Sequence, residues 1–336
     1  MGLGPGGGRV QEPAPAGRQG PGGRGRVRHR AGCRAAGTLL RRLHPERRRR
    51  CPVDPIRLKL ALKRRPAVDA ALRSAAWPVL QAQRLGAAWA AWRRGRGAYD
   101  PEFAWLPPLQ GKYRGRSCFV VGTGPSLCLE DLERIRPAYS FGVNAAVLAL
   151  GQTGWRPDFY LIQDEYVYQR LEAALALAAS SCQLKAVWVG QNIARRFPLP
   201  VGYKTYPLHL LDHRLLHRRG WGTFRCSADC YRCVYDGYSV VFSALQLAAY
   251  LGFGPIFLLG CDCDYAQPRT HFIPCGIPQP RDSGQRIIQG HRAFRAFARQ
   301  RGLRVYNCTR GGALEVYPRI PLEQAVRHAA REGRKP

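Results

Sequence analysis

Residues 118–127 read Cys-Phe-Val-Val-Gly-Thr-Gly-Pro-Ser-Leu, and this stretch decides the fold of the chain. Its apolar start predicts a buried strand that runs into a glycine turn, and the residues that follow predict a helix over 127–136. Glycine lets the backbone approach an oxyanion closely, and a following helix directs free N–H groups and the positive end of its dipole to the same point. The stretch therefore predicts a phosphate-binding turn. It has neither the Gly-Lys-Ser/Thr of a Walker loop nor the third glycine of the dinucleotide fingerprint.

Short apolar segments alternate with amphipathic ones from residue 113 onward. We predict strands over 117–121, 140–143, 159–163, 186–189, 256–260 and 303–308, and helices over 127–136, 166–179, 239–252 and 288–301. This alternation is typical of α/β proteins and predicts a Rossmann-like, doubly wound, mostly parallel sheet. Ligands of such sheets bind at the carboxyl ends of the strands, so polar residues that directly follow a strand are candidate site residues.

Polar residues follow several of the predicted strands. Asn144 comes after the second strand, where its amide could bind a ligand or close a turn. Asp164 comes after the third strand, where it could hold a hydroxyl, a base edge or a metal, or could be the N-cap of the next helix. The glycine turn supplies four candidate phosphate ligands, which are Gly122, Gly124, Pro125 and Ser126.

A pair of carboxylates follows the strand predicted over 256–260. Asp262 and Asp264 form a D-x-D pattern that resembles a hard-cation site, in which Mg²⁺ would steady a diphosphate, although no third ligand is evident. The two side chains share a face of an extended segment without having to converge. Asp262 is also a candidate catalytic residue. His271 and His291 are candidate general acid–base groups because histidine titrates near neutrality, and each could equally have a structural role.

The chain contains twelve cysteines and no export signal, so we expect reduced thiols, several of them in buried strands. Cys226, Cys230 and Cys233 have the C-x₃-C-x₂-C spacing of a radical-SAM cluster motif. Only about 100 residues follow, which is too little for the partial barrel of such enzymes, so we expect no iron–sulfur cluster. A zinc site would need a fourth donor, with Cys275 or His217 as candidates.

The formal net charge of +31 at pH 7 is concentrated at the front of the chain, where residues 1–50 hold 13 Lys or Arg and two acidic residues. A Gly/Pro/Arg-rich segment with almost no aromatics cannot bury enough apolar surface to offset its ordering entropy. We therefore expect a disordered, low-complexity basic tail over 1–54. It could be an arginine arm for nucleic acid or anionic lipid, a plain solvated tail, or translated sequence upstream of the true start.

Residues 55–98 predict helix, broken by Pro66 and Pro78, with a linker that extends to 108. A basic, Trp-bearing helix could lie on a membrane surface, but we favour packing against the main domain because Ala-rich helices with scattered Trp are ordinary core elements. The sequence has no apolar run of 18 residues and no secretory h-region. We expect a cytoplasmic protein, peripheral to the inner face of the membrane if this helix binds lipid.

Taken together, these residues resemble the 6-hydroxymethylpterin diphosphokinase MptE-like family. Bacterial members of that family occur among surface-polysaccharide and flagellin-glycosylation proteins, and the family is distantly similar to bacterial CMP-sialic-acid sialyltransferases. The resemblance covers roughly 112–323 and rests on the segments 113–127, 141–144, 157–164, 235–253, 259–262 and 305–319. Thr123 departs from the family pattern, in which a small or amide residue is usual, and the cysteine triplet lies in a variable insert.

The resemblance implies a nucleotide-binding catalytic domain over 109–325, followed by a basic tail over 326–336. It implies that the glycine turn holds phosphate, that Asn144 contacts the nucleotide, and that Asp164 and Asp262 line the same cleft. The segment 307–315 would form the far wall, with Arg310 as a phosphate ligand in fork geometry.

Two enzymatic hypotheses share this site. In the first, an MptE-like glycosyltransferase of cell-surface glycan synthesis moves a sugar from a CMP-sugar or another nucleotide sugar to a small-molecule or glycan acceptor. In the second, a pyrophosphoryl group moves from ATP to 6-hydroxymethylpterin, with Mg²⁺ held by Asp262 or Asp264. A third hypothesis is a non-catalytic nucleotide- or RNA-binding protein that acts through its arginine arm, although we do not expect nucleic acid as the partner.

Overall fold

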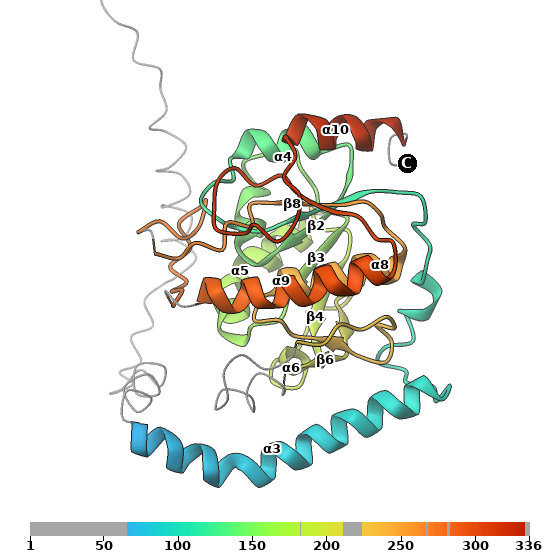
Figure 1. The fold of residues 1–336 in the computed structure, drawn as a ribbon, viewed down its shortest axis with the longest axis vertical. Coiled ribbons are helices and arrows are strands. Elements are labelled where there is room, and N and C mark those ends of the chain that lie inside the picture. The colour runs from blue at the N-terminus through green and yellow to red at the C-terminus, as the bar shows by residue number, and fades with distance from the viewer. Residues whose placement is uncertain (1–65, 182, 211–223, 267, 281–282, 333–336) are drawn as a thin grey trace, which may run out of the picture. The chain divides into compact units, whose positions relative to one another are not determined.

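The computed structural model describes residues 66–181, 183–210, 224–266, 268–280 and 283–332. Among them, seven parallel strands form one sheet in the order β5-β4-β3-β2-β1-β8-β9 (Figure 1). The bounds are β1 Cys118–Val121, β2 Tyr139–Val143, β3 Phe159–Ile162, β4 Val187–Gly190, β5 Lys204–Tyr206, β8 Ile256–Leu259 and β9 Val305–Asn307. A separate parallel pair consists of β6 Leu208–His209 and β7 Val234–Tyr235. The predicted Rossmann-like α/β fold is confirmed. The low-complexity tail predicted over 1–54 lies outside the described residues.

Helices cover both faces of the sheet. Among the described residues, the α-helices of the main domain are α4 Leu129–Ile135, α5 Glu165–Ser180, α6 Gln191–Ala194, α8 Val240–Leu251, α9 Ser283–Gln300 and α10 Leu322–Arg331. Two 3₁₀ turns, η1 Pro107–Leu109 and η2 Asn144–Ala149, complete it, and α3 Pro66–Gly95 precedes it. Figure 1 shows α4 and α10 side by side, where Arg134 and Glu323 form an ion pair of 2.8 Å.

The side chains of each strand alternate between two cores. Cys118 and Val120 of β1 face the core formed with α8 and α9, whereas Phe119 and Val121 face the core formed with α4, α5 and α10. Strands that are buried on both faces appear in the sequence as continuous apolar runs, which is why β1 and β8 could be predicted from composition.

Helix α8 illustrates how local signals and burial agree. Ser239 caps it by accepting a hydrogen bond from the backbone N–H of Val241, and Gly252 ends it with a φ of 92°. Between these caps, all but one of its residues are buried against the sheet. The predicted helix over 239–252 therefore coincides with the observed element.

Several elements were missed by the sequence reasoning. Strand β5 has only three residues and includes an exposed Lys204, so it carries no apolar run. Helix α10 was not predicted, and it continues to Arg331, into the segment 326–336 that we predicted as a basic tail. Leu322 and Ala325 of α10 are buried, and the Glu332 carboxylate accepts hydrogen bonds from the backbone N–H and the hydroxyl of Ser117 at the start of β1. Helix α10 was missed because it is short and its basic residues led us to interpret this segment as a tail.

The helix predicted over 55–98 differs from expectation in two ways, with residues 55–65 outside the described part. Pro78 does not break it, because α3 runs continuously and in a curve from Pro66 to Gly95 (Figure 1). The expected packing against the main domain is also wrong: no described side chain of α3 is buried, and Trp77, Leu85 and Trp89 are 50%, 70% and 59% exposed.

Within the described residues, no helix combines the length and the apolar character needed to span a membrane. The nine cysteines that the structure describes are free thiols.

Candidate functional site

The chain reverses its direction of travel across the sheet between β1 and β8. Strands β2 to β5 extend from one side of β1, and β8 and β9 extend from the other. Loops that leave neighbouring strands at such a switch point diverge, and ligands of open α/β sheets bind there. In the register of the sheet, Val121 pairs with Gly142 on β2 and with Leu259 on β8. The glycine turn, Asn144 and Asp262 therefore leave the sheet at nearly the same level.

The glycine turn packs directly against the end of β8. The backbone N–H of Gly122 donates to Leu259, and that of Gly124 donates to Gly260, both at 2.8 Å. A Cβ atom at Gly122 would lie 2.4 Å from the carbonyl oxygen of Gly260, and one at Gly124 would lie 1.9 Å from the Asp262 carboxylate. Glycine is required at both positions because the two loops approach closely.

Asp262 joins the two loops through its carboxylate. Oδ1 accepts from the backbone N–H of Ser126 at 3.1 Å, and Oδ2 accepts from the Ser126 hydroxyl at 2.8 Å. Burial raises the pKa of Asp262, although the hydrogen bonds from Ser126 act in the opposite direction. Asp262 thus shapes the glycine turn.

Because of these contacts, the glycine turn does not offer the free backbone N–H groups that a phosphate-binding turn was expected to have. The N–H groups of Gly122, Gly124 and Ser126 all donate within the protein, and Pro125 has none. Helix α4 begins only at Leu129 and has seven residues, later and shorter than the helix predicted over 127–136. A phosphate at the Ser126 N–H would have to displace the Asp262 carboxylate, which has the geometry of an anion already bound there.

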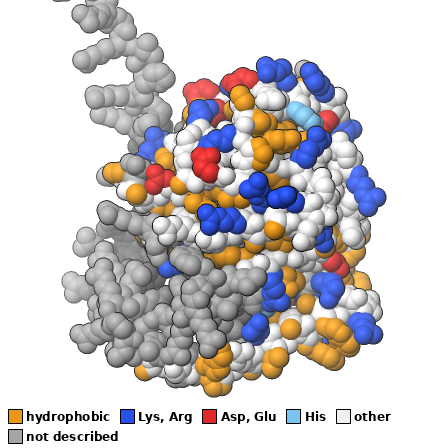
Figure 2. All heavy atoms as spheres, in the orientation of Figure 1, with side chains coloured by type: hydrophobic (Ala, Val, Ile, Leu, Met, Phe, Trp, Pro, Cys, Tyr) orange, Lys and Arg blue, Asp and Glu red, His pale blue; other side chains and the backbone are white. Residues whose placement is uncertain are grey.

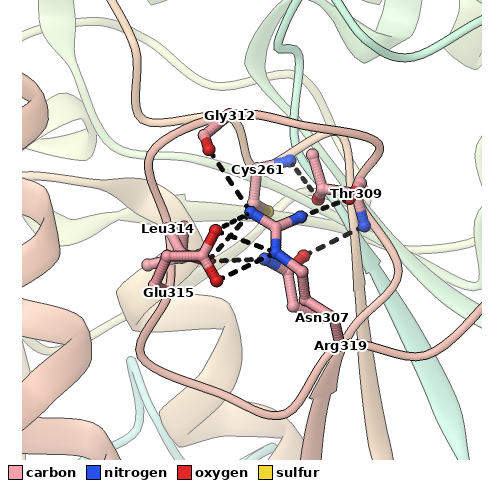
Figure 3. Close-up of polar contacts among 7 residues, drawn as sticks. All are labelled: Cys261, Asn307, Thr309, Gly312, Leu314, Glu315 and Arg319. Carbon is pink, nitrogen blue, oxygen red and sulfur yellow. Dashed lines mark hydrogen bonds and ion pairs between the residues drawn. The ribbon is translucent and has the colours of Figure 1, made fainter.

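The segment 307–319 wraps around the end of β8 and is held together by Arg319 (Figure 3). Its guanidinium donates to the Glu315 carboxylate and to the carbonyl oxygen of Thr309, the latter at 2.7 Å. Thr309 Oγ1 in turn accepts from the backbone N–H of Cys261 at 2.9 Å, and the N–H of Ala313 donates to the carbonyl of Asp262 at 2.6 Å. This segment therefore flanks Asp262.

Arg310 lies beside the glycine turn and is held by a carboxylate. Its Nη1 and Nη2 donate to Asp131 of α4 at 2.9 and 2.5 Å, and Nη2 lies 3.4 Å from the carbonyl oxygen of Ser126. Burial alone would raise the pKa of Asp131, but the bonds from Arg310 and Cys128 lower it. The Arg310 side chain remains 52% exposed, which leaves a fixed cation next to the turn.

Asn144 is the clearest unpartnered polar group at this edge. It adopts a φ of 45°, and its backbone oxygen accepts a hydrogen bond from the hydroxyl of Tyr160. Its side-chain Oδ1 is buried and has no hydrogen-bond partner. A buried polar atom without a partner is costly, and a strained backbone at the end of a strand points to a binding role.

His271 belongs to a loop that contacts the glycine turn. The N–H of the next residue, Phe272, donates to the carbonyl oxygen of Thr123 at 3.0 Å. Arg269 holds this loop by donating from Nε to the carbonyl oxygen of His271 at 3.1 Å. The Nδ1 atom of His271 lies 3.0 Å from the Thr270 hydroxyl, and burial lowers the pKa of the imidazole.

His291 occupies a different environment, because it lies on α9 with its side chain buried in the interior of the domain. It is 1% exposed, its Nδ1 lies 3.1 Å from the Tyr317 hydroxyl, and its Nε2 has no hydrogen-bond partner. Burial lowers its pKa to about 4. Of the two histidines, His271 is the one whose loop contacts the glycine turn.

The remaining carboxylates have local partners. Asp164 Oδ1 accepts from the backbone N–H of Val167 at 2.9 Å, which is the N-cap geometry that the sequence left open for it. Asp264 Oδ1 accepts from the N–H of Ala266 at 3.0 Å. With Asp262 bound to Ser126, the D-x-D pair does not present a joint set of oxygens. Among the described residues, no three His, Cys, Asp or Glu side chains are placed to hold a metal ion.

One polar cluster was not recognised from the sequence. Gln163, at the carboxyl end of β3, donates to Asp236 at 2.8 Å and accepts from the hydroxyls of Tyr206 and Ser243 at 3.0 and 2.6 Å. Its signal was available, since Gln163 ends a predicted strand in the same way as Asn144. The partners come from distant segments, which no local pattern reveals.

Comparison with known proteins identifies one family and two solved structures. A sequence model of the family described as "6-hydroxymethylpterin diphosphokinase MptE-like" matches residues 101–268, which is half of the chain. The search of curated proteins found no match to this chain.

The two solved structures are glycosyltransferases by name. The MAf glycosyltransferase from Magnetospirillum magneticum AMB-1 is 16% identical with a TM-score of 0.40, and the match covers 68% of this chain and 42% of that one. The monofunctional alpha-2,3-sialyltransferase Cst-I from Campylobacter jejuni is 13% identical with a TM-score of 0.37, over 61% and 80% of the two chains.

Proposed function

We propose, from the premise that this chain belongs to the MptE-like family, that it is a transferase acting on a nucleotide-activated donor, and that it transfers a sugar in cell-surface glycan synthesis. The observation that supports a nucleotide site is the buried, unpartnered Oδ1 of Asn144, which follows β2, the neighbour of β1 in the sheet. This atom can accept a hydrogen bond from an amino or hydroxyl group of the nucleotide. Arg310, fixed by Asp131, lies where it would balance the charge of the donor phosphate.

The proposed reaction assigns one proton transfer to this chain. The acceptor hydroxyl attacks the anomeric carbon of the donor sugar, and its proton passes to His271. The bond between the anomeric carbon and the phosphate oxygen breaks, and its electron pair stays on the nucleotide phosphate near Arg310. With Nδ1 protonated towards Thr270, Nε2 of His271 is the proton acceptor. Burial lowers the pKa of the imidazole, so at neutral pH the ring is unprotonated and its Nε2 is available to accept a proton.

The second candidate is the pyrophosphoryl transfer that the family description names. That reaction requires a divalent cation to neutralise the polyphosphate. In the observed arrangement Asp262 binds Ser126 and Asp264 accepts from Ala266, so the two carboxylates have separate partners and do not form a joint cation site. This observation favours sugar transfer as the first proposal.

A thermal-shift experiment on the full chain distinguishes the candidates. CMP, CDP, UDP, GDP, ADP and ATP are each added with and without Mg²⁺, and a ligand at 100 times its Kd should add about 2.7 kcal/mol of stability. Stabilisation by a cytidine or uridine nucleotide without Mg²⁺ supports sugar transfer. A shift that needs both ATP and Mg²⁺ supports pyrophosphoryl transfer, and no shift with any nucleotide contradicts both.

Two variants test the assigned residues. Asn144→Gly keeps the positive φ but removes the amide, so nucleotide affinity should fall about tenfold, as for a lost buried hydrogen bond. Gln152→Ala, which removes an exposed amide nearby, is the control. His271→Gln should lower kcat while leaving the nucleotide thermal shift unchanged. Equal affinities of Asn144→Gly and wild type would remove the basis for the site.

A further inference from the structure

Helix α3 exposes an apolar stripe that the main domain does not cover. Trp77, Leu85, Trp89 and Trp92, which we call the α3 stripe, are between 44% and 70% exposed. At about 100° per residue these four positions fall within an arc of roughly 120° on one side of the helix. Figure 2 shows apolar side chains at the surface along this part of the chain. Large apolar side chains that gather on one exposed side of an element often mark an interaction surface.

The stripe is ordered by contacts among its own side chains. The rings of Trp89 and Trp92 stack with centroids 4.8 Å apart, and the guanidinium of Arg96 lies 5.1 Å from the Trp92 ring. An arginine over a tryptophan face keeps a cation beside the apolar surface. The arrangement combines an indole pair with a positive charge at the end of the helix.

The other side of α3 provides its attachment. Arg94 forms an ion pair of 3.0 Å with Asp100 and donates to the carbonyl oxygen of Arg232 at 2.6 Å. Its guanidinium also lies 5.0 Å from the Phe103 ring of the main domain. The last turn of the helix is therefore attached by Arg94, while the stripe residues are left outside.

The charge of this region identifies the kind of surface that fits it. Residues 55–99 contain ten Lys or Arg and a single acidic residue, Asp69, and residues 70–99 contain no acidic residue. Such a strip is attracted to a negatively charged surface. Three of the seven tryptophans of the chain lie on α3, and tryptophan is enriched where an apolar phase meets water.

We propose that α3 lies in the interface of an anionic lipid membrane, with the α3 stripe in the acyl boundary and the flanking arginines at the headgroup phosphates. Nucleic acid would bind the arginines and stack on the tryptophans, but it would not bury Leu85. A groove on a partner protein would bury the α3 stripe, but it would not require an excess of basic charge. Only a lipid interface uses both features, which together are the signature of an interfacial helix. The proposal is independent of the reaction assigned above.

Vesicle sedimentation with the full chain tests this proposal. Neutral phosphatidylcholine vesicles are compared with vesicles that contain about a third phosphatidylglycerol, at moderate salt. The expected result is binding to the anionic vesicles, with a shift of tryptophan emission to shorter wavelength. The double variant Leu85→Glu/Trp89→Glu should reduce partitioning at least about tenfold. The matched control Leu177→Glu/Val201→Glu alters apolar side chains of the main domain that are also exposed, and should bind as wild type does.

Three outcomes would overturn the proposal. In the first outcome, the chain does not sediment with anionic vesicles. In the second, the stripe variant binds as well as the control variant, which would assign lipid binding to the remaining basic residues. In the third outcome, the chain self-associates or binds RNA without vesicles and the stripe variant abolishes that instead. Melting curves of both variants should match wild type, because the changed side chains are exposed.

Discussion

The edge where β1 and β8 end and the helix α3 contain opposite arrangements of polar and apolar groups. At the edge, carboxylates, hydroxyls and backbone amides are enclosed and bonded to one another, as in the Asp262–Ser126 contact. On α3, tryptophan and leucine side chains face solvent, and an ion pair between Arg94 and Asp100 holds the last turn. The comparison separates two roles. The edge contributes to the stability of the fold and offers one unsatisfied acceptor, whereas α3 contributes little stability and has free binding surface.

The largest expected difference between the main domain and α3 is at tryptophan. Trp155 is fully buried and donates to the Ser140 hydroxyl at 3.0 Å, so Trp155→Ala should lower the free energy of unfolding by about 3–5 kcal/mol. Trp89→Ala on α3 should change it by less than about 0.5 kcal/mol. Urea denaturation measures both. Similar losses for the two variants would show that α3 is part of the cooperative core.

A second difference is expected in the response to pH. Burial holds His291 neutral, with a pKa of about 4 against about 6.5 in the unfolded chain. Above pH 6.5 the imidazole is neutral in both states, so it does not lower the free energy of unfolding. As the pH falls from 6.5 towards 4, the unfolded chain binds a proton that the folded protein does not, and the free energy of unfolding falls by up to about 3 kcal/mol. His291→Gln should flatten this part of the curve of unfolding free energy against pH.

The control for this prediction is Tyr317→Phe, which removes the hydroxyl partner but keeps the imidazole and should keep the slope. Residues 66–95 contain no histidine, so α3 should not contribute to this dependence. An unchanged slope in His291→Gln would assign the acid sensitivity to other groups.

The third difference concerns glycine. Gly122→Ala places a methyl group 2.4 Å from the backbone oxygen of Gly260, and we expect a loss of about 2 kcal/mol. Gly86 lies in the interior of α3 with nothing within 4 Å of a built Cβ, so Gly86→Ala should be neutral or stabilise the helix by up to about 1 kcal/mol. In thermal melts, the Tm of Gly122→Ala should fall, whereas the Tm of Gly86→Ala should stay the same or rise. A tolerated Gly122→Ala would mean that the two loops can separate.

Much of the fold was accessible from the sequence because its signals are local. Continuous apolar runs identified β1 and β8, and caps such as Ser239 and Gly252 marked the ends of α8. The register of parallel strands then placed Asn144 and Asp262 at the same edge as the glycine turn, as the alternation predicted. The strand β5 and the helix α10 were missed because a short strand and a charged helix leave weak patterns.

The sequence by itself determined the parallel α/β sheet, the family and the set of candidate residues, because strand burial, helix caps and motif spacing are all properties of neighbouring positions. Only the tertiary structure decided what each residue does. It paired Asp262 with Ser126, Arg310 with Asp131 and His291 with Tyr317. It also left the side-chain Oδ1 of Asn144 without a hydrogen bond and the α3 stripe exposed to solvent. These outcomes depend on groups far apart in the chain, and the state of a polar or apolar group is set by what surrounds it in space.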